Sequence, residues 1–468
     1  MNTNADERRE SNFRAAQLLE VELAAPIPAI VPGLDESGRC YGRAVVLVRL
    51  HTEPLGSVEI ELPAGGIAAI EHAELLWSRL RGEVMRHLER DGIRVPTRLS
   101  VGGLERPIAP ACLRQRQQVL RNPLTVSVVI STRDRTDQLG PCLDSLFAME
   151  YPSFEVVVVD NAPLTDGTER FIRRRYGRVG NIRYVREEAP GLSQARNRGL
   201  MEAEGDIVAF TDDDVVVDRF WLAELVRGFL VAENAGCVTG MVLAREIETP
   251  AQEYFEQFGG FSKGFEPRIF DMEQNRPRSS LFPYAAGTFG TGANMAFRTS
   301  VLRSMGGFDP ALGAGSAAMG GEDLAAFFEI IIRGHRLVYQ PGAMVRHRHR
   351  RDVATLQRQM YTYGMGLTAF LARVAVDHPE MLPDLARRVP AGLWYALHPA
   401  SEKNRKKPKS YPRELTMIEW RGMLHGPVAY LRSRRARSPR EARNWPANGH
   451  SRGHVLEIFS ELTGPGQT

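Results

Sequence analysis

The sequence predicts an α/β protein built on a parallel sheet with helices on both faces. The main observation is an alternation of short, β-type apolar runs with helical segments that begins near residue 125. The expected strands cover residues 126–132, 155–161, 182–186 and 207–210, and the expected helices cover residues 137–148, 165–176 and 192–203. The second observation is that polar residues follow three of these strands. Ligands of such sheets gather at the carboxyl ends of the strands, so we expect a binding site there.

The bulk composition is that of an ordinary folded protein. Of 468 residues, 43% are hydrophobic and 25% are charged, which allows two or three domains with a sizeable core. Four cysteines are scattered without a C-x-x-C pair, which argues against a disulfide framework or a structural zinc site. The polar residues 1–13 lack the apolar core of a signal peptide, and no run of about 18 apolar residues could span a bilayer. We therefore expect a cytoplasmic protein.

Residues 1–120 are predicted to form a small accessory α+β module. Apolar or alternating segments at residues 44–50 and 58–62 predict strands, and a helical pattern follows at residues 67–90. The sequence shows no catalytic constellation in this region, and its role stays open.

Residues 351–468 are predicted to form a helical extension with a basic, partly disordered tail. Between residues 401 and 453 there are 14 Lys or Arg against 4 Asp or Glu, a local charge of +10. No aromatic-interleaved basic module of a nucleic-acid binder is visible, so we expect a solvated surface or contact with the inner face of a membrane. From about residue 434 the chain is expected to be poorly ordered, apart from a short helix at residues 454–462.

The most informative segment is IVAFTDDDV at residues 207–215. Asp212, Asp213 and Asp214 follow a strand that reads as buried on both faces. Adjacent carboxylates repel one another unless a cation lies among them, and oxygen ligands at a strand end suit Mg²⁺ or Mn²⁺. The alternative is a solvated acidic turn that caps the next helix.

Two other strand ends carry candidate nucleotide-binding residues. The first strand ends in Ser131, Thr132 and Arg133, with Arg135 close behind, and these side chains could hold a ribose and phosphates. Asp160 ends the second strand and could accept a hydrogen bond from the ring N–H of a pyrimidine. Asp160 could equally cap a turn.

Further candidates follow along the chain. Arg196 lies one turn into a helix that opens with Gly and Ser, an arrangement that suits a diphosphate. The glycine-rich segment at residues 287–298 allows the backbone to approach a ligand closely. Glu322 and Asp323 open a helix, where acids are commonly caps, although a carboxylate there could also act as a general base. His347 of the HRH segment, or its neighbour two residues on, could complete a metal site.

Taken in order, these segments strongly resemble the family 2 glycosyltransferases. The matching motifs are VSVVISTRDR, EVVVVDNA, GLSQARNRGL, IVAFTDDDV, GTGANMAFR, GGFDPALG and GGEDLAAFFEIIIRGHRLVYQP, which lie between about residues 123 and 350. The resemblance implies a catalytic domain at residues 121–350 with the GT-A fold, a Rossmann-like mixed sheet that binds a nucleotide-diphosphate sugar. The flanking regions lie outside the resemblance.

The resemblance also implies roles for individual residues. Asp160 would contact the base of the donor, Asp212 would lie by its ribose or the metal, and Asp214 would hold the divalent cation. Asp323 would be the catalytic base, and His347 a further metal contact. Three adjacent acids, however, leave the ligand assignment ambiguous by one position, and HRH offers two histidines where one is expected.

The implied reaction is an inverting hexosyl transfer from a nucleotide sugar to an acceptor hydroxyl, assisted by Mn²⁺ or Mg²⁺. A UDP- or dTDP-sugar is favoured over a GDP-sugar as donor, and a saccharide or a lipid-linked acceptor of cell-envelope polysaccharide synthesis as the second substrate. Two alternatives stay open. A sugar-nucleotide pyrophosphorylase would need a glycine-rich phosphate loop and a lysine near the first strand, which the chain lacks. A catalytically inactive binding scaffold would not need to keep Asp212, Asp214 and Asp323 together.

Overall fold

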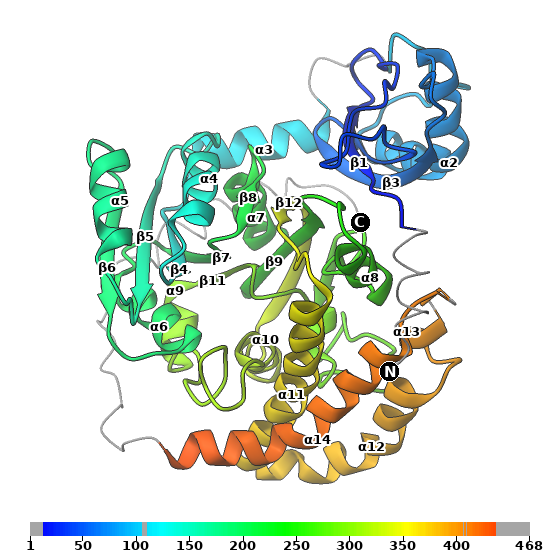
Figure 1. The fold of residues 1–468 in the computed structure, drawn as a ribbon. Helices are drawn as coiled ribbons and strands as arrows, with labels where there is room; N and C mark the ends of the chain where they lie inside the picture. Colours follow the sequence, from blue (N-terminus) through cyan, green and yellow to red (C-terminus); the bar gives the residue numbers. More distant parts are fainter. Residues whose placement is uncertain (1–12, 105–109, 406, 409, 437–468) are drawn as a thin grey trace.

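The computed structural model describes residues 13–104, 110–405, 407–408 and 410–436, and it contains two sheets (Figure 1). The expected helix at residues 454–462 lies outside these residues. The strands of the larger sheet are β4 (Val126–Thr132), β5 (Phe154–Asn161), β6 (Ile182–Glu187), β7 (Ile207–Asp212), β8 (Val215–Val217), β9 (Ala235–Ala244), β10 (Arg268–Phe270), β11 (Asn294–Arg298) and β12 (Arg336–His347). Their order is β10-β12-β9-β11-β7-β4-β5-β6, and β8 pairs with β12.

The larger sheet is mixed. Strands β7, β4, β5 and β6 are parallel, as the alternation of strands and helices predicts. Strand β11 runs antiparallel to both β7 and β9, so the expectation of a wholly parallel sheet is wrong for this half. Between β9 and β11 the chain forms a helix at residues 250–258 and strand β10, and it then enters the sheet from the opposite end. The mixed sheet implied by the family resemblance is confirmed.

Helices cover both faces of the larger sheet (Figure 1). They are α4 (Thr136–Phe147), α5 (Gly167–Tyr176), α6 (Leu192–Glu202), α7 (Trp221–Val231), α8 (Pro250–Phe258), α9 (Thr299–Ser304) and α10 (Glu322–Ile332), with a 3-10 turn η1 (Ala286–Thr288). In β4, Val128 and Ile130 pack into one core and Val129 into the other. Because both faces are buried, the strand reads as a continuous apolar run instead of an alternating one.

The smaller sheet belongs to the N-terminal part. It comprises β1 (Gln17–Glu22), β2 (Arg43–Leu50) and β3 (Glu53–Glu61), and the helices of this part are α2 (Ala69–Arg90) and α3 (Ala111–Arg121). Ion pairs join this part to the larger one. Arg49 pairs with Asp218 at 2.6 Å, and Arg116 of α3 pairs with Glu224 of α7 at 2.6 Å. The side chains of all four are largely buried, and Arg49 also pairs with Glu20 and Glu224 with Arg227, so each contact belongs to a small charged network.

The C-terminal helices are α11 (Val353–Asp377), η2 (Pro379–Met381), α12 (Leu382–Leu397), α13 (Glu402–Arg405) and α14 (Arg413–Arg435). Glycines let α11 and α14 approach closely: a Cβ at Gly364 would lie 1.9 Å from the Glu419 carbonyl oxygen. Gly321, with a left-handed φ of 90°, caps the start of α10, where a Cβ would lie 2.4 Å from the Gly366 carbonyl oxygen. The C-terminal part therefore packs against the turn that presents Asp323. None of the described helices combines the length and apolarity needed to cross a bilayer.

Candidate functional site

Asp212, Asp214 and His347 form a group of metal-binding side chains at the edge of the larger sheet. One ligand atom from each lies within 4.8 Å of the others. Asp212 ends β7, and Asp214 follows two residues later. The short strand β8 then pairs antiparallel with β12, with Val215 opposite His347, and this register brings the histidine beside the acids.

Ion pairs hold Asp214 in its charged form. His347 Nε2 lies 3.2 Å from Asp214 Oδ1, and Arg135 Nη2 lies 3.0 Å from Asp214 Oδ2. Burial alone would raise the pKa of Asp214, but His347 and Arg135 outweigh burial and lower it well below its usual range. For the same reason the pKa of His347 is raised, although its burial acts in the opposite direction.

Asp213 has a different environment from its two neighbours. Thr132 Oγ1 donates to Asp213 Oδ2 at 2.7 Å, and Arg135 Nη1 lies 2.7 Å from Asp213 Oδ1. Burial raises the pKa of Asp213 to about 7 even though Arg135 opposes the shift. Asp213 is therefore buried at the strand end. It contacts Thr132 and Arg135, two residues that the sequence predicts to bind a nucleotide.

The two histidines of the HRH segment contact different carboxylates. His349 Nε2 lies 2.8 Å from Glu256 Oε1, and the ring of Phe255 packs 4.6 Å from the His349 ring. His347 is the one that contacts Asp214. Of the two histidines, His347 is the one that lies with Asp212 and Asp214 in the group of possible ligands.

Asp323 and Glu322 lie at the start of α10 and differ in exposure. Glu322 is buried, and it accepts a hydrogen bond from Arg196 Nη1 at 2.8 Å. Burial and then Asp323 raise the pKa of Glu322 to about 7, against the opposing effect of Arg196. Asp323 is half-buried, and its Oδ2 accepts from the Gly292 backbone N–H at 2.8 Å. Of the two predicted bases, Asp323 is the more accessible.

Arg196 connects the two acidic groups. Its Nη2 lies 3.5 Å from Asp212 Oδ1 and donates to the Gly292 carbonyl oxygen at 3.0 Å, while Nη1 binds Glu322. A Cβ at Gly292 would lie 2.9 Å from Nη2 of this guanidinium and 3.3 Å from Asp323 Oδ2. Arg196 therefore neutralises neighbouring acids, and it is less free for a diphosphate than the sequence suggested.

The predicted nucleotide end of the site lies at the adjacent strands. Asp160 is fully buried at the end of β5; Tyr184 donates to its Oδ2 at 3.1 Å, and its Oδ1 has no partner among the described residues. Burial raises the pKa of Asp160. Ser131 lies opposite Asp212 in the register of β4 and β7, and its buried hydroxyl has no partner in the described part of the chain, whereas Arg133 is exposed. An unpaired buried carboxylate oxygen is a suitable acceptor for a ligand N–H.

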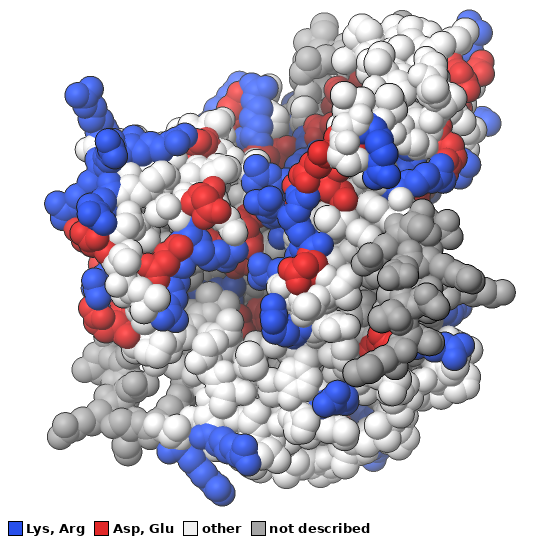
Figure 2. Space-filling view, in the orientation of Figure 1, with Lys and Arg blue, Asp and Glu red and all other residues white. Residues whose placement is uncertain are grey.

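Sequence reasoning missed two basic residues at the site. Arg350 Nη1 lies 4.0 Å from Asp214 Oδ2. Lys263 is half-buried; burial lowers its pKa to about 8, and the nearby charge of Asp323 opposes that shift. A lysine inside the glycine-rich run GGFSKG is a weak signal that could have indicated a loop near a ligand. Figure 2 shows basic and acidic side chains side by side in the hollowed centre of this face.

The donor set fits a divalent cation. Two carboxylates and one imidazole suit Mn²⁺ or Mg²⁺ more than a soft metal, because no sulfur ligand is present in the group. The side chain of Asp212 is 33% exposed, which leaves the group open on one side. An acidic, partly open site at the carboxyl ends of parallel strands is the arrangement of an α/β nucleotide-binding protein.

Comparison with known proteins identifies the family. The model of the family described as "Glycosyltransferase like family 2" matches residues 123–366, more than half of the chain. The chain belongs to this family, and its mixed α/β sheet is the GT-A fold.

Two curated relatives illustrate the range of similar proteins. The pre-mycofactocin glycosyltransferase of Mycobacterium tuberculosis is 27% identical over 256 residues, which are 54% of this chain and 48% of the relative. The glucosyl-dolichyl phosphate glucuronosyltransferase of Haloferax volcanii is 27% identical over 237 residues, which are 48% of this chain and 69% of the relative. The chain thus spans about half the length of the mycobacterial relative.

Among solved structures, the mannosyltransferase PcManGT from Pyrobaculum calidifontis, in complex with GDP-Man and Mn²⁺, is 19% identical and has a TM-score of 0.41. The similarity covers 68% of this chain and 91% of that one.

Proposed function

We propose that this chain is an inverting, metal-assisted hexosyltransferase. It moves a sugar from a nucleotide-diphosphate sugar to an acceptor hydroxyl. Residues 121–350 form the catalytic unit, and residues 1–120 and 351–468 are accessory units. The observation that carries the proposal is the connection of the Asp212–Asp214–His347 group to Asp323 through Arg196 and Gly292.

Asp212, Asp214 and His347 would hold the cation, Mn²⁺ or Mg²⁺. When bound, such an ion neutralises the charge that develops on the departing diphosphate. Arg135 and Arg350 add positive charge next to Asp214, beside the proposed cation site. Asp160 would accept the ring N–H of the base, which favours a uracil or thymine nucleotide as donor.

Asp323 is the general base of the proposal. Its half-buried carboxylate takes the proton of the acceptor hydroxyl while the oxygen forms a bond to the anomeric carbon. The bond from this carbon to the diphosphate oxygen breaks on the opposite face, so the configuration inverts. The hydrogen bond from the Gly292 N–H keeps Asp323 oriented.

Release of nucleoside diphosphate from a panel of UDP-, dTDP- and GDP-sugars with Mn²⁺ tests the reaction. Wild type should turn over one donor class, and Asp323→Asn should bind that donor but release product at least about a hundredfold more slowly. If both proteins bind a nucleotide and neither turns over any donor, the inactive scaffold becomes the better reading. Formation of a nucleotide sugar from a nucleoside triphosphate would instead indicate a pyrophosphorylase.

The C-terminal helices supply a surface for a lipid-linked acceptor at the inner face of a membrane. Large apolar side chains on α12 and α14 are exposed: Leu382, Val389, Leu393, Trp394, Leu397, Met417, Leu424, Val428 and Leu431. Arginines on the same helices are also exposed, including Arg387, Arg421 and Arg432. In Figure 2 the lower part of this face, where Figure 1 places α12 and α14, shows blue side chains and few red ones. Apolar and basic side chains together favour an anionic lipid surface.

Sedimentation with vesicles tests this surface. The full chain should sediment with phosphatidylglycerol vesicles more than with phosphatidylcholine vesicles, and a Leu393→Glu/Leu424→Glu variant should lose the difference. Leu164→Glu changes a leucine that is as exposed as Leu424 but lies on another part of the molecule, and it serves as the control. Equal sedimentation of the wild type with both lipids would remove the membrane from the proposal.

A further inference from the structure

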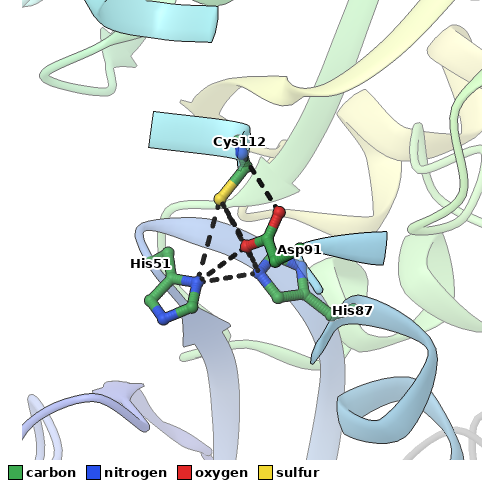
Figure 3. Close-up of side chains that lie close together, drawn as sticks. All are labelled: His51, His87, Asp91 and Cys112. Carbon is green, nitrogen blue, oxygen red and sulfur yellow. Dashed lines mark hydrogen bonds and ion pairs between the residues drawn. The ribbon is translucent and has the colours of Figure 1, made fainter. Parts of the chain in front are cut away.

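A second group of metal-binding side chains lies in the N-terminal part. His51, His87, Asp91 and Cys112 each direct one ligand atom toward a common point (Figure 3). The exposed fractions of His51, His87 and Cys112 are 2%, 1% and 7%, and that of the Asp91 side chain is 4%. The sequence showed neither this group nor any zinc motif, because its members come from a turn, a helix end and a second helix.

The six distances between the four ligand atoms describe a slightly irregular tetrahedron. His51 Nδ1 lies 3.1 Å from both His87 Nε2 and Asp91 Oδ2. Cys112 Sγ lies 3.8 Å from His51 Nδ1, 3.8 Å from His87 Nε2 and 3.0 Å from Asp91 Oδ2. The last distance, between His87 Nε2 and Asp91 Oδ2, is 3.3 Å. Tetrahedral zinc bonds place such atoms roughly 3.3–3.6 Å apart, so an ion fits with shifts of about half an ångström.

The backbone of the turn between β2 and β3 is adapted to present His51. His51 and Thr52 have φ values of 55° and 67°, in the left-handed region that a two-residue hairpin turn requires and that Asn-Gly normally fills. Glu22 holds this turn, because its carboxylate accepts from the backbone N–H groups of His51 at 3.0 Å and Thr52 at 2.7 Å. A strained turn that carries a buried histidine indicates a function for that side chain.

The other ligands are also held in place. His87 in the last turn of α2 and Asp91 after it are four residues apart and share a face of the helix. The Cys112 N–H donates to Asp91 Oδ1 at 3.1 Å, which leaves Oδ2 for the common point. His87 Nδ1 lies 3.7 Å from Glu53 Oε2, which places a negative charge beside this ring without a hydrogen bond. A cavity of about 250 Å³, lined in part by His87, Asp91 and Cys112, gives an ion a way in.

The arrangement differs from a nucleophile relay. In a Cys-His-Asp relay the two nitrogens of one imidazole contact the thiol and the carboxylate separately. Here His51 directs the same Nδ1 at the thiol, the carboxylate and the second imidazole. Convergence on one point is the geometry of ligands around an ion.

We propose that His51, His87, Asp91 and Cys112 bind a structural zinc ion. A thiolate, two imidazoles and a carboxylate are a zinc donor set, and four protein ligands close the site to substrate. Binding releases the thiol proton of Cys112 to solvent. The ion ties the β2–β3 turn and the end of α2 to the start of α3. Because Arg116 of α3 pairs with Glu224 of α7, the ion also fixes the N-terminal part against the larger sheet.

Metal analysis of the full chain, purified without chelator, tests the site. Wild type should contain about one zinc ion per chain, and Cys112→Ser should lose most of it. Cys40→Ser, which changes an exposed cysteine outside the cluster, and Asp214→Ala, which changes the acidic site, should both keep the zinc. Equal zinc in wild type and Cys112→Ser would overturn the proposal.

Cobalt substitution gives a second readout that needs only the wild-type fold. Chelator-treated wild type reloaded with Co²⁺ should show the absorption of tetrahedral cobalt together with a thiolate-to-cobalt charge-transfer band. The Cys40→Ser protein should show the same band. If wild type is folded, holds no zinc after loading and gives no such band with Co²⁺, the four side chains form only a hydrogen-bonded cluster and the proposal is wrong.

Discussion

The acidic site and the histidine-cysteine cluster contrast in the way they surround a cation. The acidic site offers Asp212, Asp214 and His347 and is open to solvent beside Asp212, whose side chain is 33% exposed. The cluster of the N-terminal part offers four buried ligands, and its cysteine sulfur is a softer ligand than a carboxylate or an imidazole. An open set of two carboxylates and an imidazole leaves room for a ligand phosphate, whereas a closed set with a thiolate serves the fold. Substitutions should therefore separate catalysis from stability.

The largest effect is expected from Asp323→Asn. The change removes the proton acceptor but keeps the size of the side chain, so kcat should fall on the order of 10³-fold while donor binding stays near wild type. Steady-state sugar transfer and nucleotide binding, measured on the same preparation, check this. Glu322→Gln is the matched neighbour and should cost about tenfold or less, because Gln can still accept from Arg196. A larger loss in Glu322→Gln than in Asp323→Asn would exchange their roles.

Glu329→Gln tests a third charged cluster, one that stabilises the fold without binding a ligand. Burial alone would raise the pKa of Glu329, but Arg373 and His378 lower it to about 2 from 4.5. The shift corresponds to about 3 kcal/mol of stability, fully present above about pH 4.5 and lost as pH falls through the folded pKa. Urea unfolding should show this deficit in the variant near neutral pH and a narrowing gap in acid. A gap that is constant with pH would show that packing, not charge, is lost.

His347→Gln and His349→Gln form a pair that separates metal binding from packing. His347 contacts Asp214, whereas His349 contacts Glu256. Only the first change should weaken Mn²⁺ binding, by at least about tenfold. Titration of each variant with Mn²⁺, followed by electron paramagnetic resonance, measures both affinities. Equal losses in the two variants would assign the effect to the shared aromatic surroundings.

Gly292→Ala should have a modest effect on activity. The new methyl group would lie 2.9 Å from the Arg196 guanidinium, so that side chain must shift away from Asp212 and Glu322. We expect a loss of about tenfold in kcat/KM. Gly287→Ala, in the same loop, would meet only Leu324 at 3.6 Å and should remain near wild type. Equal activity of the two variants would show that the position of Arg196 is unimportant.

The acidic site could be predicted largely because its residues follow strands in order along the chain. Apolar runs located the ends of β4, β5 and β7, and the acids after them had to meet at one edge of the sheet. What the sequence could not supply was the direction of each side chain. Asp213 is turned to Thr132, and His349 to Glu256, and these contacts depend on elements far apart in the chain.

The histidine-cysteine cluster could not be predicted, because its ligands also lie on elements that are far apart in the chain. His51 lies in a hairpin turn and Cys112 in a helix sixty-one residues later, so no short spacing connects them. The antiparallel placement of β11 was equally hidden, because a five-residue apolar strand looks the same in either direction. Local patterns specify elements, whereas packing between distant elements decides which side chains meet.

The most direct test of the catalytic site is calorimetric binding of UDP, dTDP and GDP with and without Mn²⁺. Wild type and Asp323→Asn should bind one nucleotide class only when Mn²⁺ is present, and Asp214→Ala should lose that binding. Binding that is independent of Mn²⁺, or unchanged in Asp214→Ala, would contradict the assignment of Asp212, Asp214 and His347 as the cation site.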